Sequence, residues 1–297
     1  MIRARGILPV LLLAAAACKP ALPPVAELAV TPGRLDLAWP EFAEVEISIE
    51  PLADLPAGGA PPIVFLHLLD EPGSVVRTFD HPLPQPWRVG HRITYRVRVF
   101  QSALGEPLRA GEYLLTAGLY RRGQERFPLR SSGEPVSRYE YRVGSVGIHA
   151  PSDRMPQARF SEHWLPPQAG ADRQVVARRA LRGGAAGTIQ FGPVDGAGRL
   201  MLTFLIPDAV GSSRLEVLDG GSLPKVRLTS SCGGGQPEVS GVGRVEIDLE
   251  VPAAAAPRLC DITLAPNFEV TSSDRAEATS VVLEGLSWGP AADAAAD

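Results

Sequence analysis

The 297-residue chain has 29 Lys and Arg against 33 Asp and Glu, a formal net charge of −4, with 45% hydrophobic and 21% charged residues. This balance is typical of a globular protein and excludes a disordered one, and because the chain has no basic run it argues against nucleic acid as a partner. The 30 Gly and 29 Pro supply many turn formers and favour short strands over long helices.

The N-terminus has the parts of an export signal. Arg3 and Arg5 precede an apolar stretch over residues 7–17. At a rise of about 1.5 Å per residue this stretch is too short to cross a bilayer as a helix. We therefore predict a signal peptide over residues 1–17.

Residues 15–18 (Ala-Ala-Ala-Cys) resemble the lipobox of bacterial lipoproteins, although that family prefers Leu where Ala15 stands. The resemblance implies a diacylglycerol on Cys18, cleavage before it, and a lipid-anchored protein facing the periplasm or cell surface. Lys19, where inner-membrane retention uses Asp, implies the outer membrane. The proline-rich residues 18–24 then form a lipidated tether. The alternative is an ordinary secretory signal cleaved at an Ala-x-Ala site.

Alternating apolar and polar residues mark half-buried strands in a first predicted domain, residues 25–147. The clearest runs cover residues 44–50, 93–99, 113–119 and 139–143. Residues 63–69 are continuously apolar and suit a central strand covered on both faces. Regularly spaced turns between these runs predict an antiparallel Ig-like β-sandwich.

Part of this domain resembles an Ig-like accessory domain of bacterial envelope proteins that is often appended to membrane glycosyltransferase-like chains. The resemblance covers about residues 60–130 and rests on residues 64–70, Gly73, 75–76, 80–81, Trp87, Gly90, 109–113, 118–120, Arg126 and 128–129. It implies a place in the cell envelope. Because the chain has no polytopic membrane segment, transferase activity is not implied.

Several polar and aromatic residues here have two interpretations. We interpret His67 as a packed, hydrogen-bonded histidine in preference to a ligand, and Asp80-His81 as a turn cap in preference to an acid–base pair. Trp39 and Trp87 lie near prolines at strand ends. They either pack against the core or form a sugar-stacking platform.

A second domain is predicted over residues 158–290. Alternation recurs in the ranges 200–206, 245–251, 260–264 and 281–288, and residues 173–182 suit a short helix or turn. The order of these runs resembles jelly-roll, galactose-binding-like accessory modules, on the evidence of residues 179–181, 189–193, 200–207 and 283–288. The resemblance implies a second β-sandwich.

We predict a disulfide between Cys232 and Cys260, because both lie in one domain of an exported protein and are the two cysteines left once Cys18 is acylated. Sequence alone does not establish their pairing. The five histidines are scattered and no Cys-x-x-Cys occurs, so we predict no metal site. No catalytic or dinucleotide motif occurs either, and we predict no cofactor and no enzyme activity.

The leading hypothesis is a non-enzymatic, membrane-anchored envelope lipoprotein that binds glycan or assists a polysaccharide-handling complex. Trp39, Trp87 and Trp164 are its candidate ligand-binding residues, and Trp288 has a similar setting. One alternative is a scaffold subunit that binds another envelope protein. A second is an unrecognised glycoside hydrolase, since two distant carboxylates leave no local signature.

Overall fold

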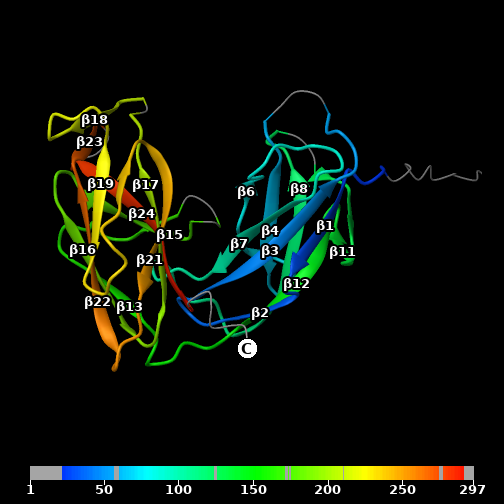
Figure 1. Cartoon of the computed structure of the whole chain (residues 1–297), viewed down its shortest axis with the longest axis horizontal. Coiled ribbons are helices and arrows are strands. Elements are labelled where there is room, and N and C mark those ends of the chain that lie inside the picture. Colours follow the sequence, from blue (N-terminus) through cyan, green and yellow to red (C-terminus); the bar gives the residue numbers. More distant parts are fainter. Residues whose placement is uncertain are drawn as a thin grey trace, which may run out of the picture.

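The computed structural model describes residues 22–56, 60–123, 126–170, 173, 175–209, 211–273 and 277–290. These residues form strands β1 to β24 and no helix, which confirms the all-β prediction. Figure 1 shows the strands gathered into two groups that lie side by side. The predicted signal peptide and Cys18 lie outside the described residues.

The N-terminal sandwich is built from two sheets. The first has the order β10 (Leu129–Ser131), β1 (Ala26–Thr31), β3 (Phe42–Pro51) and β7 (Ile93–Phe100). The second has the order β11 (Pro135–Ser137), β12 (Glu140–Ile148), β8 (Gly111–Tyr120), β4 (Ile63–Leu69) and β5 (Val75–Thr78). Three short strands extend the second sheet: β2 (Arg34–Leu37) on β12, β6 (His81–Pro82) on β4, and β9 (Arg126–Phe127) on β8.

Side-chain alternation explains how these sheets pack. In β3, Val45, Ile47 and Ile49 point into the core, while the intervening polar residues face outward. The outer face carries Glu44 opposite Arg98 of β7 in the antiparallel register. In β4, Val64, Leu66 and Leu68 enter the core. Its other face is covered as well, which confirms a strand buried on both sides.

The C-terminal sandwich also has two sheets. One has the order β13 (Gln157–Phe160), β16 (Gly187–Val194), β22 (Arg258–Pro266), β19 (Lys225–Ser230) and β20 (Glu238–Ser240). The other has the order β14 (Gln168–Ala169), β15 (Ala177–Arg182), β24 (Thr279–Pro290), β17 (Gly198–Ile206) and β21 (Gly243–Val251). β23 (Phe268–Ser272) joins β24 and pairs with β18 (Ser213–Val217).

Each sandwich has its own core, and the two clusters of buried side chains share no residue. Cys232 and Cys260 lie in the C-terminal core and form a disulfide, with Cα atoms 5.3 Å apart. For a sequence separation of 28 residues, chain entropy gives a stabilisation of about 3–4 kcal/mol. The predicted domain boundaries and the Ig-like and jelly-roll likenesses stay predictions.

Two local expectations change. Residues 177–182 form strand β15, so the short helix or turn expected over 173–182 is wrong for this part of the range. Pairing with β24 overrides the local pattern. The pairing is also not wholly antiparallel, because β1 with β10 and β2 with β12 run parallel.

The two sandwiches meet at a junction that is held by main-chain and side-chain contacts. The loop after β7 runs beside β24, where Ala103 N donates to Leu286 O at 2.7 Å and Ser287 Oγ donates to Gln101 O at 2.8 Å. Trp288 N donates to Pro40 O at 2.8 Å. Figure 1 shows β7 reaching toward the C-terminal sandwich at this place.

Candidate functional site

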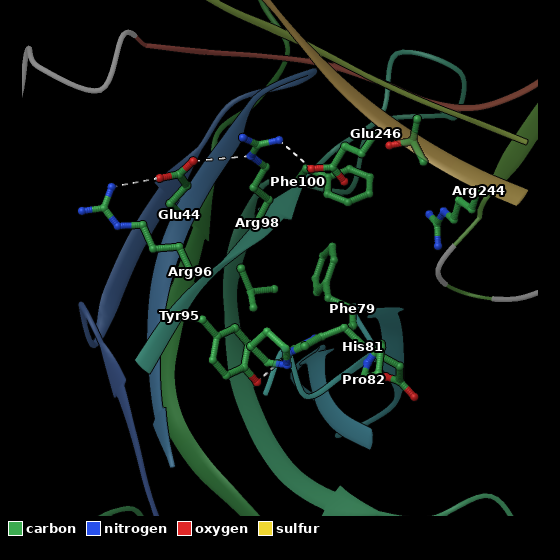
Figure 2. Close-up of a pocket in the computed structure, with 14 residues that line it drawn as sticks. Glu44, Phe79, His81, Pro82, Tyr95, Arg96, Arg98, Phe100, Arg244 and Glu246 are labelled. Atoms are coloured by element: carbon green, nitrogen blue, oxygen red, sulfur yellow. Dashed lines mark hydrogen bonds and ion pairs between the residues drawn. The ribbon is translucent and has the colours of Figure 1, made fainter. Parts of the chain in front are cut away.

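A cleft of about 510 Å³ opens beside this junction, and we call it the junction cleft. One wall comes from β7 and the segment 79–84 of the N-terminal sandwich, and the other from β17 and β21. β7 is an edge strand that pairs with β3 alone among the described strands. Figure 2 shows aromatic side chains on one side and charged ones along the rest. The lining residues are Glu44, 79–82, Pro84, 95–98, Phe100, Thr203, Arg244 and Glu246.

The aromatic part of the cleft consists of two edge-on ring pairs. Tyr95 meets His81 with ring centroids 5.4 Å apart, and Phe79 meets Phe100 at 5.3 Å. Phe79 is buried in the N-terminal core, so the partly exposed ring surface here comes from Tyr95, His81 and Phe100. The tilted ring arrangement is the one that aromatic quadrupoles favour.

Hydrogen bonds fix the tautomer of His81. Its Nδ1 lies 2.8 Å from Phe79 O, which only accepts, so Nδ1 carries the proton. Nε2 therefore accepts the hydroxyl proton of Tyr95, also at 2.8 Å. Burial lowers the pKa of His81 and raises the pKa of Tyr95. The His81 and Tyr95 rings are thus both neutral near pH 7.

The charged part of the cleft is a chain of paired groups. Arg98 binds Glu44 at 3.4 Å and, across the junction, Glu246 at 2.6 Å. Arg96 lies 3.5 Å from Glu44. These ion pairs are the dashed lines along the upper part of Figure 2. Each arginine of this chain therefore already has a carboxylate partner.

Two further groups complete the far wall. Arg244 lies 3.3 Å from Glu284, so it too is paired with a carboxylate. Thr203 Oγ1 is buried beside the cleft and has no hydrogen-bond partner within the described part of the chain. A buried hydroxyl without a partner is rare in folded proteins.

A buried polar cluster surrounds His67, on the face of β4 that points away from the N-terminal core. Glu140 accepts hydrogen bonds from Thr116 Oγ1 at 2.6 Å, Ser137 Oγ at 2.8 Å and Arg126 at 2.6 Å. His67 faces Glu140 through Nδ1 at 3.2 Å and Asp80 through Nε2 at 3.6 Å. The interpretation of His67 as a packed, hydrogen-bonded histidine is confirmed. Asp80, expected as a turn cap, accepts the Tyr120 hydroxyl at 3.0 Å.

The four tryptophans do not come together, and none lines the junction cleft. Trp39 Nε1 donates to Ser102 O at 3.2 Å, and Trp87 Nε1 donates to Ala53 O at 3.0 Å. Trp288 packs against the C-terminal core, and Trp164 is buried in it. The Trp164 indole N–H has no hydrogen-bond partner within the described part of the chain. A role of Trp39, Trp87 and Trp164 in ligand binding stays a prediction.

Tyr95, Phe100 and Arg98 were not predicted as candidate site residues. The alternation along β7 predicts a half-buried strand, but it contains no sign that Tyr95 borders a cleft or that Arg98 meets a second sandwich. The edge position of β7 and the neighbouring prolines at 82 and 84 were the available signals.

The described ranges of the chain hold no group of three or more His, Cys, Asp or Glu side chains placed to bind a metal ion. They also contain no helix with the length and hydropathy needed to cross a membrane.

Comparisons with known proteins identify no family. No family model matches the chain, and no curated protein does. A Salmonella alpha-2-macroglobulin structure matches 92% of this chain and 15% of its own length, at 13% identity and a TM-score of 0.24. A structure named pT26-6p matches 89% of this chain and 64% of its own, at 8% identity and a TM-score of 0.23. Scores this low assign no fold family and no function.

Proposed function

We propose that this protein is a non-enzymatic, lipid-anchored envelope lipoprotein that binds a glycan in the junction cleft. One observation carries the proposal: the cleft combines neutral aromatic rings with a chain of paired arginines and carboxylates. Sugars offer both an apolar C–H face and many hydroxyls. The rings suit the first, and the charged groups suit the second through charge-assisted hydrogen bonds.

The pairing of the charges supports a neutral glycan over an anion. Arg96, Arg98 and Arg244 each have a carboxylate neighbour, so a phosphate or uronate entering the cleft would meet carboxylates as well as cations. A hydroxyl both donates and accepts, and so fits between the two kinds of group. The same pairing argues against a glycoside hydrolase. Glu44 and Glu246 are both engaged in ion pairs with Arg98 and are therefore not free to act as the two catalytic carboxylates.

Binding should depend on the ring of Tyr95. We expect Tyr95→Ala to weaken glycan binding at least about tenfold, or about 1.4 kcal/mol, because the stacking surface is lost. Tyr95→Phe, which keeps the ring, should retain most of the affinity. The measurement is an array of bacterial envelope glycans followed by calorimetry on the strongest ligand.

Trp87→Ala is the matched control, since its indole lies outside the cleft. It should bind as the unmodified protein does. Loss of binding in Trp87→Ala together with full binding in Tyr95→Ala would show that the glycan binds at the tryptophans and not in the junction cleft. Failure of the unmodified protein to bind any glycan would refute the proposal and leave the scaffold alternative ahead.

The anchor is a separate part of the proposal and rests on the lipobox-like sequence at Cys18. We expect Cys18→Ser to move the protein from the membrane fraction to the soluble periplasmic fraction, because the thiol that accepts the lipid is gone. Immunoblotting of fractionated cells measures this, with Cys232→Ser as a variant that keeps the lipidation site. Unchanged membrane partitioning of Cys18→Ser would contradict the anchor.

A further inference from the structure

A second cavity, of about 480 Å³, adjoins the junction cleft. The two share the segment Asp80–Pro82, which forms a ridge between them. The other residues of the second cavity come from the segment before β4, the start of β4, the end of β5, and the end of β8 with the turn beyond it. They are 60–61, Ile63, Thr78, Tyr120 and Arg122. Each volume falls within the range of about 300–1,000 Å³ common for small-molecule sites.

Asp80 and His81 line both cavities, and each is hydrogen-bonded to a tyrosine of a different one. The His81 ring is bound to Tyr95, which lines the junction cleft. The Asp80 carboxylate accepts the hydroxyl of Tyr120, which lines the second cavity. Strand β6 pairs with β4 through Pro82 with Ile63 and His81 with Val64, so the ridge is fixed on the sheet. A ligand lying over it meets rigid groups on both sides.

The two cavities also resemble each other chemically. Each has a tyrosine whose hydroxyl is hydrogen-bonded to the ridge, at least one arginine, and the proline ring of Pro82. Two similar sites in direct continuity suit a ligand that repeats its own chemistry. A monosaccharide would need only one of them.

We infer that the ligand is a linear glycan chain that crosses the Asp80–Pro82 ridge and occupies both cavities with successive sugar units. This inference rests on the proposed function and names the substrate class for the same site. It makes the second cavity a subsite that only longer chains reach.

Chain length is the variable that tests this inference. The probes are size-graded cello-, chito- and malto-oligosaccharides, from monosaccharide to octasaccharide, measured by calorimetry with the full-length periplasmic form carrying Cys18→Ser. For at least one series, affinity should rise at least about tenfold between disaccharide and octasaccharide and then level off. An affinity that is flat beyond the disaccharide would overturn the two-cavity inference and leave the single site standing. No binding by any series would count against the proposed function itself.

Variants locate the length dependence. Arg122→Ala and Tyr120→Phe should each lower octasaccharide affinity at least several-fold and leave disaccharide affinity unchanged, because both residues line the second cavity only. Tyr95→Ala should lower both. Arg88→Ala is the control, an exposed arginine that lines neither cavity. If Arg122→Ala and Tyr120→Phe both leave octasaccharide binding intact, the chain does not cross the ridge.

Discussion

Glu140→Gln should lower the free energy of unfolding by about 3–5 kcal/mol, because it removes one partner of a buried ion pair. The carboxylate is almost fully buried and is shared by Arg126 and His67. Loss of its charge leaves two cationic groups facing an amide with half the acceptor capacity. The two hydroxyls that now donate to Glu140 lose acceptor strength as well.

The pH dependence of stability gives a second readout of this cluster. Burial by itself opposes ionisation of Glu140, but hydrogen bonds from His67, Thr116, Ser137 and Arg126 outweigh it and hold the pKa of Glu140 far below the ordinary 4.5. The stability that comes from Glu140 is therefore complete above pH 4.5 and is lost as the pH falls toward the folded pKa.

His67 acts in the opposite direction. Burial by itself lowers the pKa of His67, but hydrogen bonds to Asp80 and Glu140 outweigh it and raise the pKa above 6.5. Its contribution to stability is complete below pH 6.5 and is lost as the pH rises through the folded pKa. The cluster should thus stabilise the fold most between about pH 4.5 and 6.5.

Urea unfolding of the purified protein between pH 4 and pH 9 measures both effects. Glu134→Gln is the control, an exposed glutamate on the same β11–β12 side of the sandwich. It should match the unmodified protein at every pH. The difference between Glu140→Gln and the unmodified protein should shrink at high pH as His67 loses its proton. Equal unfolding free energies at pH 6 would show that the cluster contributes nothing.

Phe42→Ala is expected to lower the free energy of unfolding by about 3–5 kcal/mol and to loosen the junction. Phe42 is 2% exposed yet belongs to neither core cluster. The guanidinium carbons of Arg98 and Arg199 lie 5.1 and 5.4 Å from its ring centroid. A Cβ at Gly289 would collide with the same ring, so β24 approaches it closely.

Truncation of Phe42 also removes the surface on which two junction ion pairs are arranged. Arg98 reaches Glu246, and Arg199 reaches Glu44 at 3.1 Å, so both arginines that cover the ring cross between the sandwiches. Without the ring these side chains lose a cation–π contact and their orientation. The two sandwiches should then sample a wider range of separations.

Spin labels on Glu71→Cys and Leu223→Cys measure that separation, since both positions are exposed and lie on different sandwiches. Pulsed electron resonance should give a narrow distance distribution for the otherwise unmodified protein and a broad one with Phe42→Ala. Phe268→Ala, in the C-terminal core, should cost similar stability and leave the distribution narrow. A narrow distribution with Phe42→Ala would show that the ring does not hold the junction.

Much of the architecture could be predicted because burial alternates locally along each strand. The pattern in residues 44–50 and 245–251 predicts β3 and β21, with Val45 and Leu249 turned inward. The continuous run of β4 predicts a strand covered on both faces. Two cysteines in one predicted domain suggested the disulfide. The strand predictions need only a two-residue period, which neighbouring residues show directly. The disulfide prediction needs only the number of cysteines in the domain.

The candidate site could not be predicted in this way. Tyr95 and His81 meet only because β6 packs beside the edge strand β7, and Arg98 finds Glu246 only because a second sandwich lies against the first. Strand alternation predicts which residues face outward, but it does not predict which other strands or side chains those residues contact. The outward residues of β7 and β21 meet because Phe42, Gly289 and the main-chain bonds to β24 fix the junction, and these long-range contacts exist only in the tertiary structure.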